Sequence, residues 1–365
     1  MKIAFDAKRA FWNNRGLGNY SRDVIRLLAT YAPANEYFLC GVPNRQRETL
    51  LRQGTVVAPE GWWKYLPSLW RSGGMLSQLQ GMDVYHGLSG ELPWGIEKTG
   101  IKSVVTMHDA IFVRYPELYS TTYRWLFTKK VQYACNVADI IIAISEQTKR
   151  DLVEFFHADE KKIRVVYQGC SNIFRESVTE RQIAEVRRKY ALPDCYLLDV
   201  GAIEPRKNMK NLLRAMAVAG VSLPLVAIGG KSRYADEMAI EAKRLGVDLR
   251  MLHNVPFADF PAIYKAAEVM CYPSIFEGFG IPILEAMCVD TPVLTSTGSC
   301  FAETGGDAAL YADPLNPKEI GTQLLRILNE DGLRKEMIQK GQEQAARFTD
   351  ERVAANLIKI YEELR

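Results

Sequence analysis

Short runs of β-branched and aliphatic residues alternate along the chain with longer segments whose apolar residues recur at helical spacing. The runs predict strands at 2–7, 36–42, 55–58, 83–87, 102–108, 139–145 and 163–169, and again at 195–202, 224–230, 249–254, 268–274, 292–296 and 308–313. The amphipathic segments predict helices at 18–31, 119–137, 146–156, 208–219, 234–246, 259–267, 281–288, 317–329 and 331–347.

This alternation builds parallel sheets that helices cover on both faces. A chain of 365 residues is too long for one ordinary core, so the two sets of elements predict two Rossmann-like domains facing across a cleft. The pattern breaks in QGCSNIFRESV, which places the domains at 1–170 and 171–348. One amphipathic helix remains at about 349–365, and its apolar stripe must be buried on one of the two domains.

Composition narrows the class of protein. Hydrophobic residues make up 48% and charged residues 24%, which is typical of a soluble globular protein. The start, MKIAFDAKRAFW, carries charges within its first strand and does not resemble a signal peptide, so we expect a cytoplasmic protein. Seven cysteines without a CxxC pair predict buried free thiols rather than disulfides or metal ligands.

Charge is uneven between the two halves. Residues 1–170 contain 22 Lys and Arg against 16 Asp and Glu, whereas residues 171–365 contain 24 against 27. A mildly basic first half would suit an anionic acceptor or a membrane surface, and ordinary scatter of surface charge explains the counts equally well. The positive charge is too weak for a nucleic-acid-binding protein, and no nucleic-acid-binding module is present.

Candidate chemistry lies where predicted strands end, as expected for open parallel sheets. Gly16 and Gly18 precede a helix, where backbone amides could approach an anion, although a tight loop would need the same glycines. His108 enters the loop after the strand at 102–108. It is either a catalytic or sugar-binding group or a structural histidine capped by Asp109.

A basic pair follows the first strand of the second half. Arg206 and Lys207 stand between that strand and a helix in GAIEPRKNMKNLL. Their position suits charge-assisted hydrogen bonds to a diphosphate. A solvated basic turn is the alternative interpretation.

Two carboxylates surround an apolar turn in FEGFGIPILEAM, residues 276–287. Gly280 lets the backbone approach a ligand, and Pro282 suits the first turn of a helix whose free amides could bind phosphate. Glu277 could accept hydrogen bonds from sugar hydroxyls, and Glu285, in the first turn or so of the helix, from a ribose. Two surface acids near a turn are the alternative.

The stretch FEGFGIPILE resembles the motif of two glutamates, separated by seven residues, in retaining glycosyltransferases of family 4, which have the GT-B fold. GLGNYSR resembles the glycine loop of that family, TMHDAIF and AISEQTKRDL its mid-domain signatures, VVYQGCSNIF its domain boundary, and VGAIEPRKNMKNLL its diphosphate-binding turn. The motifs follow the family's order over nearly the whole chain. The chain departs at Ala202, where many members have an arginine that Arg206, next to Lys207, could replace.

The resemblance implies metal-independent transfer of a hexose from a nucleotide diphosphate sugar to an acceptor hydroxyl, with retention of configuration and no cofactor besides that co-substrate. The first domain would bind the acceptor, the second the nucleotide sugar, and the last helix would cross back onto the first domain. No DxD triplet is present, which agrees with cationic side chains in place of a metal. Catalytic roles are implied for His108, Arg206, Lys207 and Glu277, and donor contacts for Gly16, Gly18, Ser145, Phe279, Gly280, Ile281 and Glu285.

The substrates are less clearly encoded. IEPRKN and VYQGCS resemble members that often use GDP-mannose, so we expect mannosyl transfer to a glycan or lipid-linked acceptor in cell-surface polysaccharide assembly. GWWKYLPSLWRSGGML, residues 61–76, combines three tryptophans with two cations and suits peripheral contact with the inner face of a membrane, whereas a core-packing helix would bury those tryptophans. A sugar-nucleotide epimerase, a phosphorylase and a non-catalytic sugar-nucleotide-binding protein are the alternatives on this fold.

Overall fold

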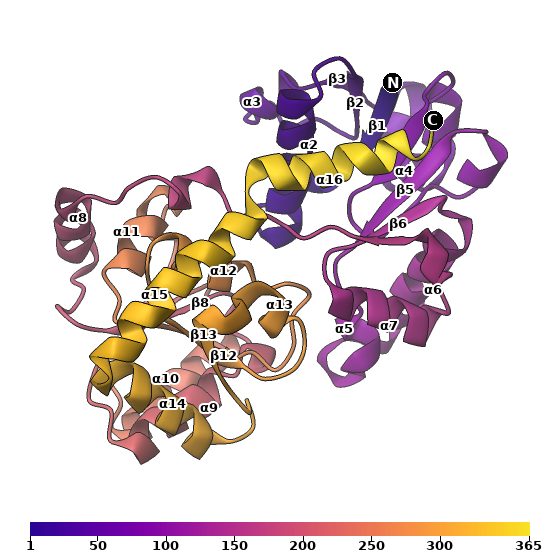
Figure 1. Ribbon diagram of the computed structural model, residues 1–365. Coiled ribbons are helices and arrows are strands. Elements are labelled where there is room, and N and C mark those ends of the chain that lie inside the picture. Colours follow the sequence, from indigo (N-terminus) through magenta and orange to yellow (C-terminus); the bar gives the residue numbers. More distant parts are fainter. The chain divides into compact units, whose positions relative to one another are not determined.

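The computed structural model describes all residues from 1 to 365, and they form two compact units (Figure 1). Unit 1 comprises Met1–Gln168 together with Asp350–Arg365, and unit 2 comprises Gly169–Thr349. The sequence predicted that the first domain ends at residue 170 and that the last helix begins at about residue 349, within two residues of these bounds. Each unit contains one parallel sheet with helices packed on it, so the predicted α/β fold class is confirmed.

Unit 1 has a seven-stranded sheet in the order β3-β2-β1-β4-β5-β6-β7. Its strands are β1 (Lys2–Asp6), β2 (Glu36–Cys40), β3 (Thr55–Val57), β4 (Val84–Gly87), β5 (Lys102–Met107), β6 (Ile140–Ala143) and β7 (Ile163–Val165). Its helices are α1 (Lys8–Trp12), α2 (Gly16–Tyr31), α3 (Glu48–Leu51), α4 (Pro67–Ser72), α5 (Ile111–Arg114), α6 (Thr121–Val137), α7 (Glu146–Phe156) and α16 (Asp350–Glu362). The short 3₁₀ helices are η1 (Gly61–Tyr65), η2 (Gly74–Gln78), η3 (Ile96–Lys98), η4 (Pro116–Leu118) and η5 (Glu160–Lys162).

Unit 2 has a six-stranded sheet in the order β10-β9-β8-β11-β12-β13. Its strands are β8 (Leu197–Val200), β9 (Leu225–Ile228), β10 (Leu249–Leu252), β11 (Val269–Tyr272), β12 (Val293–Ser296) and β13 (Ala309–Ala312). Its helices are α8 (Glu180–Tyr190), α9 (Met209–Ala219), α10 (Arg233–Leu245), α11 (Phe260–Lys265), α12 (Ile281–Cys288), α13 (Phe301–Gly305), α14 (Pro317–Asn329) and α15 (Asp331–Ala345). The 3₁₀ helices are η6 (Asn172–Phe174), η7 (Pro205–Lys207), η8 (Phe257–Asp259), η9 (Gly306–Ala308) and η10 (Ala346–Phe348).

The central strands of both sheets are apolar runs because helices cover them. All four residues are buried in β4, β6, β8, β9, β11 and β12. Burial on both faces removes the alternation of polar and apolar residues that a half-exposed strand would show. Asp199 in β8 is the charged exception, and it lies next to the candidate site described below.

The seven cysteines are all free, and five of them are buried as their apolar surroundings predicted. Cys195 is exposed and Cys288 is partly buried. None of the helices combines the length and the apolar character needed to cross a bilayer.

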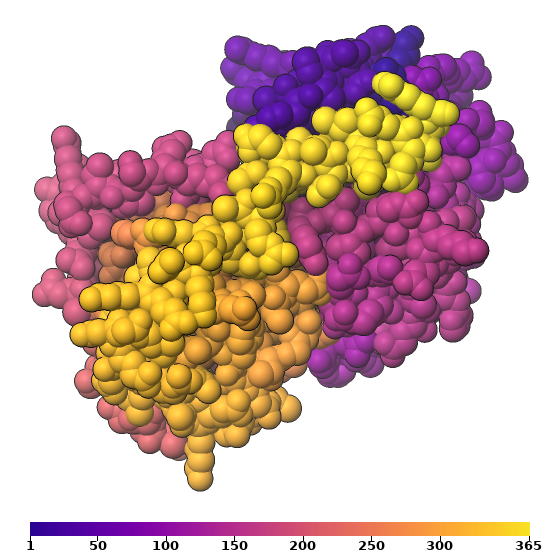
Figure 2. All heavy atoms as spheres, viewed as in Figure 1, coloured from indigo at the N-terminus to yellow at the C-terminus, as the bar shows by residue number.

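The last helix, α16, packs on α2 in unit 1, and its yellow atoms lie against the indigo N-terminal residues in Figure 2. Leu357, Ile360 and Tyr361 are buried there, on the apolar stripe read from the sequence. An ion pair of 2.8 Å between Arg26 Nη1 and Asp350 Oδ2 joins the start of α16 to α2. The stripe therefore completes the core of the first unit.

A buried chain of hydrogen bonds connects α16 to the sheet of unit 1. His86 Nδ1 lies 2.6 Å from Tyr361 Oη, and His86 Nε2 lies 2.8 Å from Thr106 Oγ1. Thr106 Oγ1 lies 3.1 Å from Tyr20 Oη. Burial lowers the pKa of His86 to about 3, with a smaller contribution from His108, so the imidazole is neutral. Each ring nitrogen then has one hydroxyl partner.

We expect Tyr361→Phe to lower the free energy of unfolding by about 1–3 kcal/mol, because it leaves one buried nitrogen of His86 without a partner. Tyr31→Phe is the matched control, since Tyr31 Oη of α2 donates to Glu351 Oε1 of α16 at 2.8 Å in an exposed bond. Denaturant unfolding would measure both variants. Equal losses in the two would show that the buried network adds nothing beyond an exposed bond.

Candidate active site

The strand order of unit 2 brings two loops together at one edge of its sheet. The chain passes from β8 outward to β9 and β10, and then returns to place β11 on the other side of β8. The loops after β8 and β11 therefore diverge at a topological switch point, where open α/β sheets bind their ligands. Arg206 and Lys207 are in the first loop, and Glu277 is in the second.

Asn208 joins these two loops. Its side-chain amide donates to the carbonyl of Pro273 at 3.0 Å and to that of Pro314 at 2.7 Å, and the amide of Ile275 donates to the carbonyl of Arg206 at 2.9 Å. Asn208 has a positive φ of 64°, a conformation that asparagine tolerates better than most residues. Asn208 was not among the residues predicted from the sequence, although it directly follows the basic pair Arg206 and Lys207.

Glu277 forms the centre of a charged cluster. Its Oε1 lies 2.6 Å from Lys207 Nζ and 2.6 Å from Arg206 Nη1. Lys207 also donates to Tyr272 Oη at 2.7 Å, and its ammonium lies 4.7 Å from the centre of that ring. Burial alone would raise the pKa of Glu277, but the two cations hold it down at about 2. The alternative interpretation of Arg206 and Lys207 as a solvated turn is wrong, because both side chains are mostly buried.

The turn after Glu277 is held in place by side chains that no sequence motif had indicated. Ser299 Oγ bonds to both the amide and the carbonyl of Glu277, at 3.1 and 2.9 Å. Thr304 Oγ1 donates to the carbonyl of Phe279 at 2.6 Å. Gly280 has φ of 97° at the N-cap of α12, and no side chain caps that helix. Pro282 has no N–H and the amide of Ile283 donates to the carbonyl of Gly280 at 2.9 Å, so the amide of Ile281 is the one that this uncapped helix start offers to an anion.

Glu285 is the fifth residue of α12, whose bounds are those predicted from the sequence. It is 8% exposed and Glu277 is 9% exposed, so the interpretation as two surface acids is wrong. Tyr264 Oη donates to Glu285 Oε2 at 2.8 Å. Burial raises the pKa of Glu285 to about 7, against the smaller opposite effect of that hydrogen bond. The two carboxylates of the motif thus have opposite environments, one beside two cations and one in an apolar setting.

Asp199 is a further acid next to this cluster that sequence reasoning missed. Burial raises its pKa to about 7, and the charge of Lys207 partly opposes the shift. The sequence does mark Asp199, because it is a carboxylate within the otherwise apolar run YLLDVG. No group of three or more His, Cys, Asp and Glu side chains is arranged to hold a metal ion.

His108 follows β5 in unit 1, as predicted, and is half-buried. Its Nε2 lies 2.9 Å from the carbonyl oxygen of Leu88, so Nε2 carries the proton and Nδ1 presents a lone pair. Tyr20 meets the imidazole edge to face at 4.6 Å. Burial lowers the pKa of His108 to about 4, so the ring is neutral. The carboxylate of Asp109 accepts from the amide of Ile111 at 3.0 Å.

Two of the remaining predicted residues of unit 1, Gly18 and Ser145, have structural roles that do not require a ligand. A Cβ on Gly18 would lie 1.9 Å from the carbonyl oxygen of Asn13, so close packing alone requires glycine there. Gly16 is exposed, with nothing near its absent Cβ. Ser145 is buried and caps α7, accepting from the amide of Thr148 at 3.0 Å. Thr148 Oγ1 in turn donates to the carbonyl of His108 at 3.1 Å, so Ser145 and His108 lie in one network.

Two family models match the chain, one in each half. Residues 16–171 match the model described as Glycosyltransferase Family 4, and residues 182–344 match the model described as Glycosyl transferases group 1. The O-antigen chain mannosyltransferase B of Escherichia coli is 27% identical over 99% of both chains. The O-antigen chain mannosyltransferase RfbU of Salmonella typhimurium is 30% identical over 59% of this chain and 57% of its own.

Solved structures with the same fold cover the chain from end to end. The crystal structure of Anabaena Alr3699/HepE with UDP and glucose has a TM-score of 0.78 and 18% identity, and covers all of both chains. That of WaaG, a glycosyltransferase involved in lipopolysaccharide biosynthesis, has a TM-score of 0.73 and 14% identity over 98% of this chain and 99% of its own. These likenesses concern the fold.

Proposed function

Since the chain is a glycosyltransferase that belongs to family 4 and has the GT-B fold, we propose that it transfers a hexose from a nucleotide diphosphate sugar to an acceptor hydroxyl with retention of configuration. The loops at the switch point of unit 2 form the donor site. The observation that carries this assignment is the pair of cations that share Glu277 Oε1, at 2.6 Å each.

The leaving group of such a reaction is a nucleoside diphosphate, which gains negative charge as the glycosidic bond breaks. Arg206 and Lys207 are fixed before the donor arrives, because Glu277, Tyr272 and the carbonyl of Phe276 already orient them. Preorganised cations in a partly dry site stabilise developing charge without a cost of reorganisation at the moment of reaction. Arg206 thereby takes the place that Ala202 leaves empty.

The two glutamates then have separate tasks. Glu277 remains ionised at any working pH because its pKa is about 2, so it can accept hydrogen bonds from the hydroxyls of the donor sugar. The backbone amides around Phe279, Gly280 and Ile281 receive phosphate oxygens. Glu285 accepts from the ribose hydroxyls, and because its pKa is about 7 in the empty site, binding is favoured by its deprotonation.

For unit 1 we retain His108, Gly16, Gly18 and Ser145 as predicted contacts of the donor. The neutral His108 presents the Nδ1 lone pair as an acceptor for a sugar hydroxyl. Glycine at position 18 is explained by packing alone, so Gly16 is the stronger candidate for contact through its backbone.

The donor that we propose is GDP-mannose, and the acceptor is a glycan or lipid-linked glycan of a cell-surface polysaccharide. The names of two relatives, both O-antigen chain mannosyltransferases, support this choice. Relatives named D-inositol 3-phosphate glycosyltransferase, such as that of Corynebacterium jeikeium at 28% identity, show that neighbouring sequences serve other acceptors. No cofactor or metal forms part of the proposal.

A donor panel tests the proposed function. The full chain is heated with GDP-, UDP-, ADP- and TDP-sugars, and the stabilising donor is then incubated with a mannose disaccharide while the product is followed by NMR. We expect stabilisation by GDP-mannose and a new α-glycosidic bond that appears only with acceptor. Epimerised donor, or turnover that needs no acceptor, would favour an epimerase or a phosphorylase.

A further inference from the structure

Unit 1 contains a second candidate site, at its own switch point. Its sheet order places β1 between β2 and β4, so the chain diverges after β1 and β4 as it does after β8 and β11 in unit 2. An open pocket of about 370 Å³ lies directly after β1. Its lining residues are Lys8, Arg9, Trp12, Asn13, Asn14 and Arg15, which we call the basic pocket.

The three cations of the basic pocket have no carboxylate in direct contact. Lys8, Arg9 and Arg15 form no ion pair, and no carboxylate lines the pocket. Burial and the positive charges of Arg71 and Arg9 lower the pKa of Lys8, against smaller opposite effects of Glu91 and Asp6. Such a set of cations raises the local concentration of an anionic ligand.

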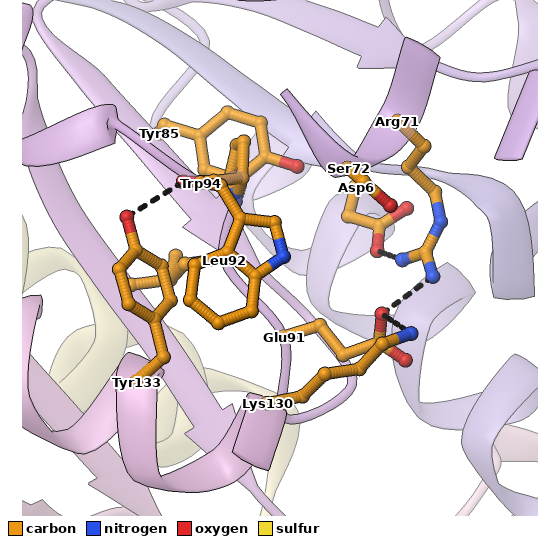
Figure 3. Close-up of a pocket in the computed structure, with 10 residues that line it drawn as sticks. Asp6, Arg71, Ser72, Tyr85, Glu91, Leu92, Trp94, Lys130 and Tyr133 are labelled. Atoms are coloured by element: carbon orange, nitrogen blue, oxygen red, sulfur yellow. Dashed lines mark hydrogen bonds and ion pairs between the residues drawn. The ribbon is translucent and has the colours of Figure 1, made fainter. Parts of the chain in front are cut away.

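The two acids whose charges act on Lys8, Asp6 and Glu91, already have cationic partners, which Figure 3 shows. Asp6 Oδ2 lies 2.6 Å from Arg71 Nη1, and Glu91 Oε2 lies 2.6 Å from Arg71 Nη2 and 3.1 Å from Lys130 Nζ. This network of two acids and two bases surrounds a cavity of only about 10 Å³, which is room for a single water molecule at most. The two negative and two positive charges of this network balance one another. Lys8 forms no ion pair with either acid.

The pocket also contains neutral hydrogen-bond donors and the flat face of an indole ring. Arg15, the N-cap of helix α2, lines the pocket together with the side-chain amides of Asn13 and Asn14. The indole of Trp12 is 58% exposed, and its Nε1 donates to the carbonyl of Val42 at 2.8 Å, which fixes the ring. Phosphoryl oxygens are the ligands that this combination of cations and side-chain amides suits best.

We propose that the basic pocket binds a phosphate or diphosphate group carried by the acceptor. The inference rests on the proposed function, in which the donor diphosphate is already assigned to Arg206 and Lys207 in unit 2. The cations of the basic pocket belong to unit 1 and are not among the residues assigned to that diphosphate, so they can serve a second anion. Arg9 is close enough to His108 for its charge to add to the effect of burial on the imidazole, so the pocket and His108 belong to one region.

Two kinds of acceptor carry such a group, a lipid-linked sugar and a soluble sugar phosphate. The segment from η1 through α4 exposes four large apolar side chains, Trp62, Tyr65, Leu66 and Leu69. Arg71 of α4 reaches Asp6 at the end of β1, and Asp6 Oδ1 accepts from the amide of Lys8 at 3.2 Å, which ties the segment to the pocket. A lipid chain would extend onto those apolar side chains.

The test reads ligand binding at Trp12 in the full chain, so it does not depend on turnover. Inorganic diphosphate is titrated while tryptophan fluorescence is recorded, and Trp12→Phe identifies the share of the signal that comes from the pocket. We expect a saturable signal that Arg9→Gln/Arg15→Gln weakens by about tenfold or more, because two charge-assisted contacts are lost. Arg52→Gln/Lys161→Gln, which removes two exposed cations of unit 1 outside the pocket, is the matched control and should bind normally.

Two further arms separate this proposal from the donor assignment and identify the carrier. Lys207→Met should leave the Trp12 signal intact, and Arg9→Gln/Arg15→Gln should leave the calorimetric affinity for GDP intact. Farnesyl diphosphate binding about tenfold tighter than inorganic diphosphate would identify a lipid-linked acceptor, and equal binding a soluble sugar phosphate. Unchanged diphosphate binding in Arg9→Gln/Arg15→Gln, or loss of GDP binding in that variant, would overturn the proposal.

Discussion

Replacing Lys207 with methionine is expected to lower the turnover number by about a hundredfold or more while the chain remains folded. Methionine keeps most of the length of the side chain and can still pack on the ring of Tyr272, which the ammonium now faces at 4.7 Å. What it removes is the charge next to the departing diphosphate. Initial rates of nucleoside diphosphate release at saturating donor measure the effect.

Lys265→Met is the control for this prediction. Lys265 Nζ pairs with Asp290 Oδ2 at 2.7 Å in the same unit, so the variant also loses an ion pair of a lysine. Its turnover should stay within about twofold of the wild type, because a partly exposed pair contributes little. A folded Lys207→Met enzyme with near-normal rates would show that this lysine does not act on the leaving group.

Replacing Glu277 with glutamine is expected to destabilise the ligand-free chain by about 3 kcal/mol. Arg206 and Lys207 both bind Oε1 of Glu277, so the neutral amide leaves two mostly buried cations with less compensation. A bound diphosphate would restore the missing negative charge. The rise in melting temperature on adding GDP should therefore be larger in Glu277→Gln than in the wild type.

Glu268→Gln provides the comparison, since Glu268 Oε2 pairs with Arg334 Nη1 at 2.6 Å elsewhere in unit 2. It should lose less stability and should respond to GDP as the wild type does. An equal GDP response in Glu277→Gln and the wild type would contradict the idea that the cations and the carboxylate form one diphosphate site.

The sequence predicted the strands well because a buried parallel strand is an unbroken apolar run. It overestimated their lengths where apolar residues continue beyond the last paired residue, as in 139–145, where β6 covers only Ile140–Ala143. Helix α8 was missed although Thr179 and Gln182 form a capping box that was legible in the sequence. Helix α1 has five residues, too few for a periodic signal, and so the basic pocket could not be predicted.

Residues 61–76 were interpreted from their composition either as a core-packing helix or as a membrane-contacting segment, and their tryptophans differ in burial. Trp70 is buried and donates to Gln78 Oε1 at 2.6 Å, as a core-packing helix requires. Trp62 is exposed and stacks on Trp63 at 3.8 Å, as an interfacial segment would. Composition could not separate the two roles, because Pro67 starts a new helix between these tryptophans.

The site was predicted as a set of residues but not as a set of contacts. Resemblance placed Arg206 and Lys207 at the diphosphate and Glu277 at the donor sugar, yet no local pattern indicates that both cations share one oxygen of this distant glutamate. The opposite pKa shifts of Glu277 and Glu285 likewise depend on partners distant in sequence. The apolar turn between the two acids now has a reason, since it buries Glu285 while Glu277 reaches the cations.

The central claim is that the switch point of unit 2 binds the donor, with Glu285 at the ribose. Calorimetry at pH 8, where Glu285 with its pKa of about 7 is mostly ionised, can compare GDP with its 2′,3′-dideoxy form. Loss of both hydroxyls should weaken binding about tenfold or more in the wild type and in Lys207→Met, and about threefold or less in Glu285→Gln. An equal loss in all three proteins would contradict the claim.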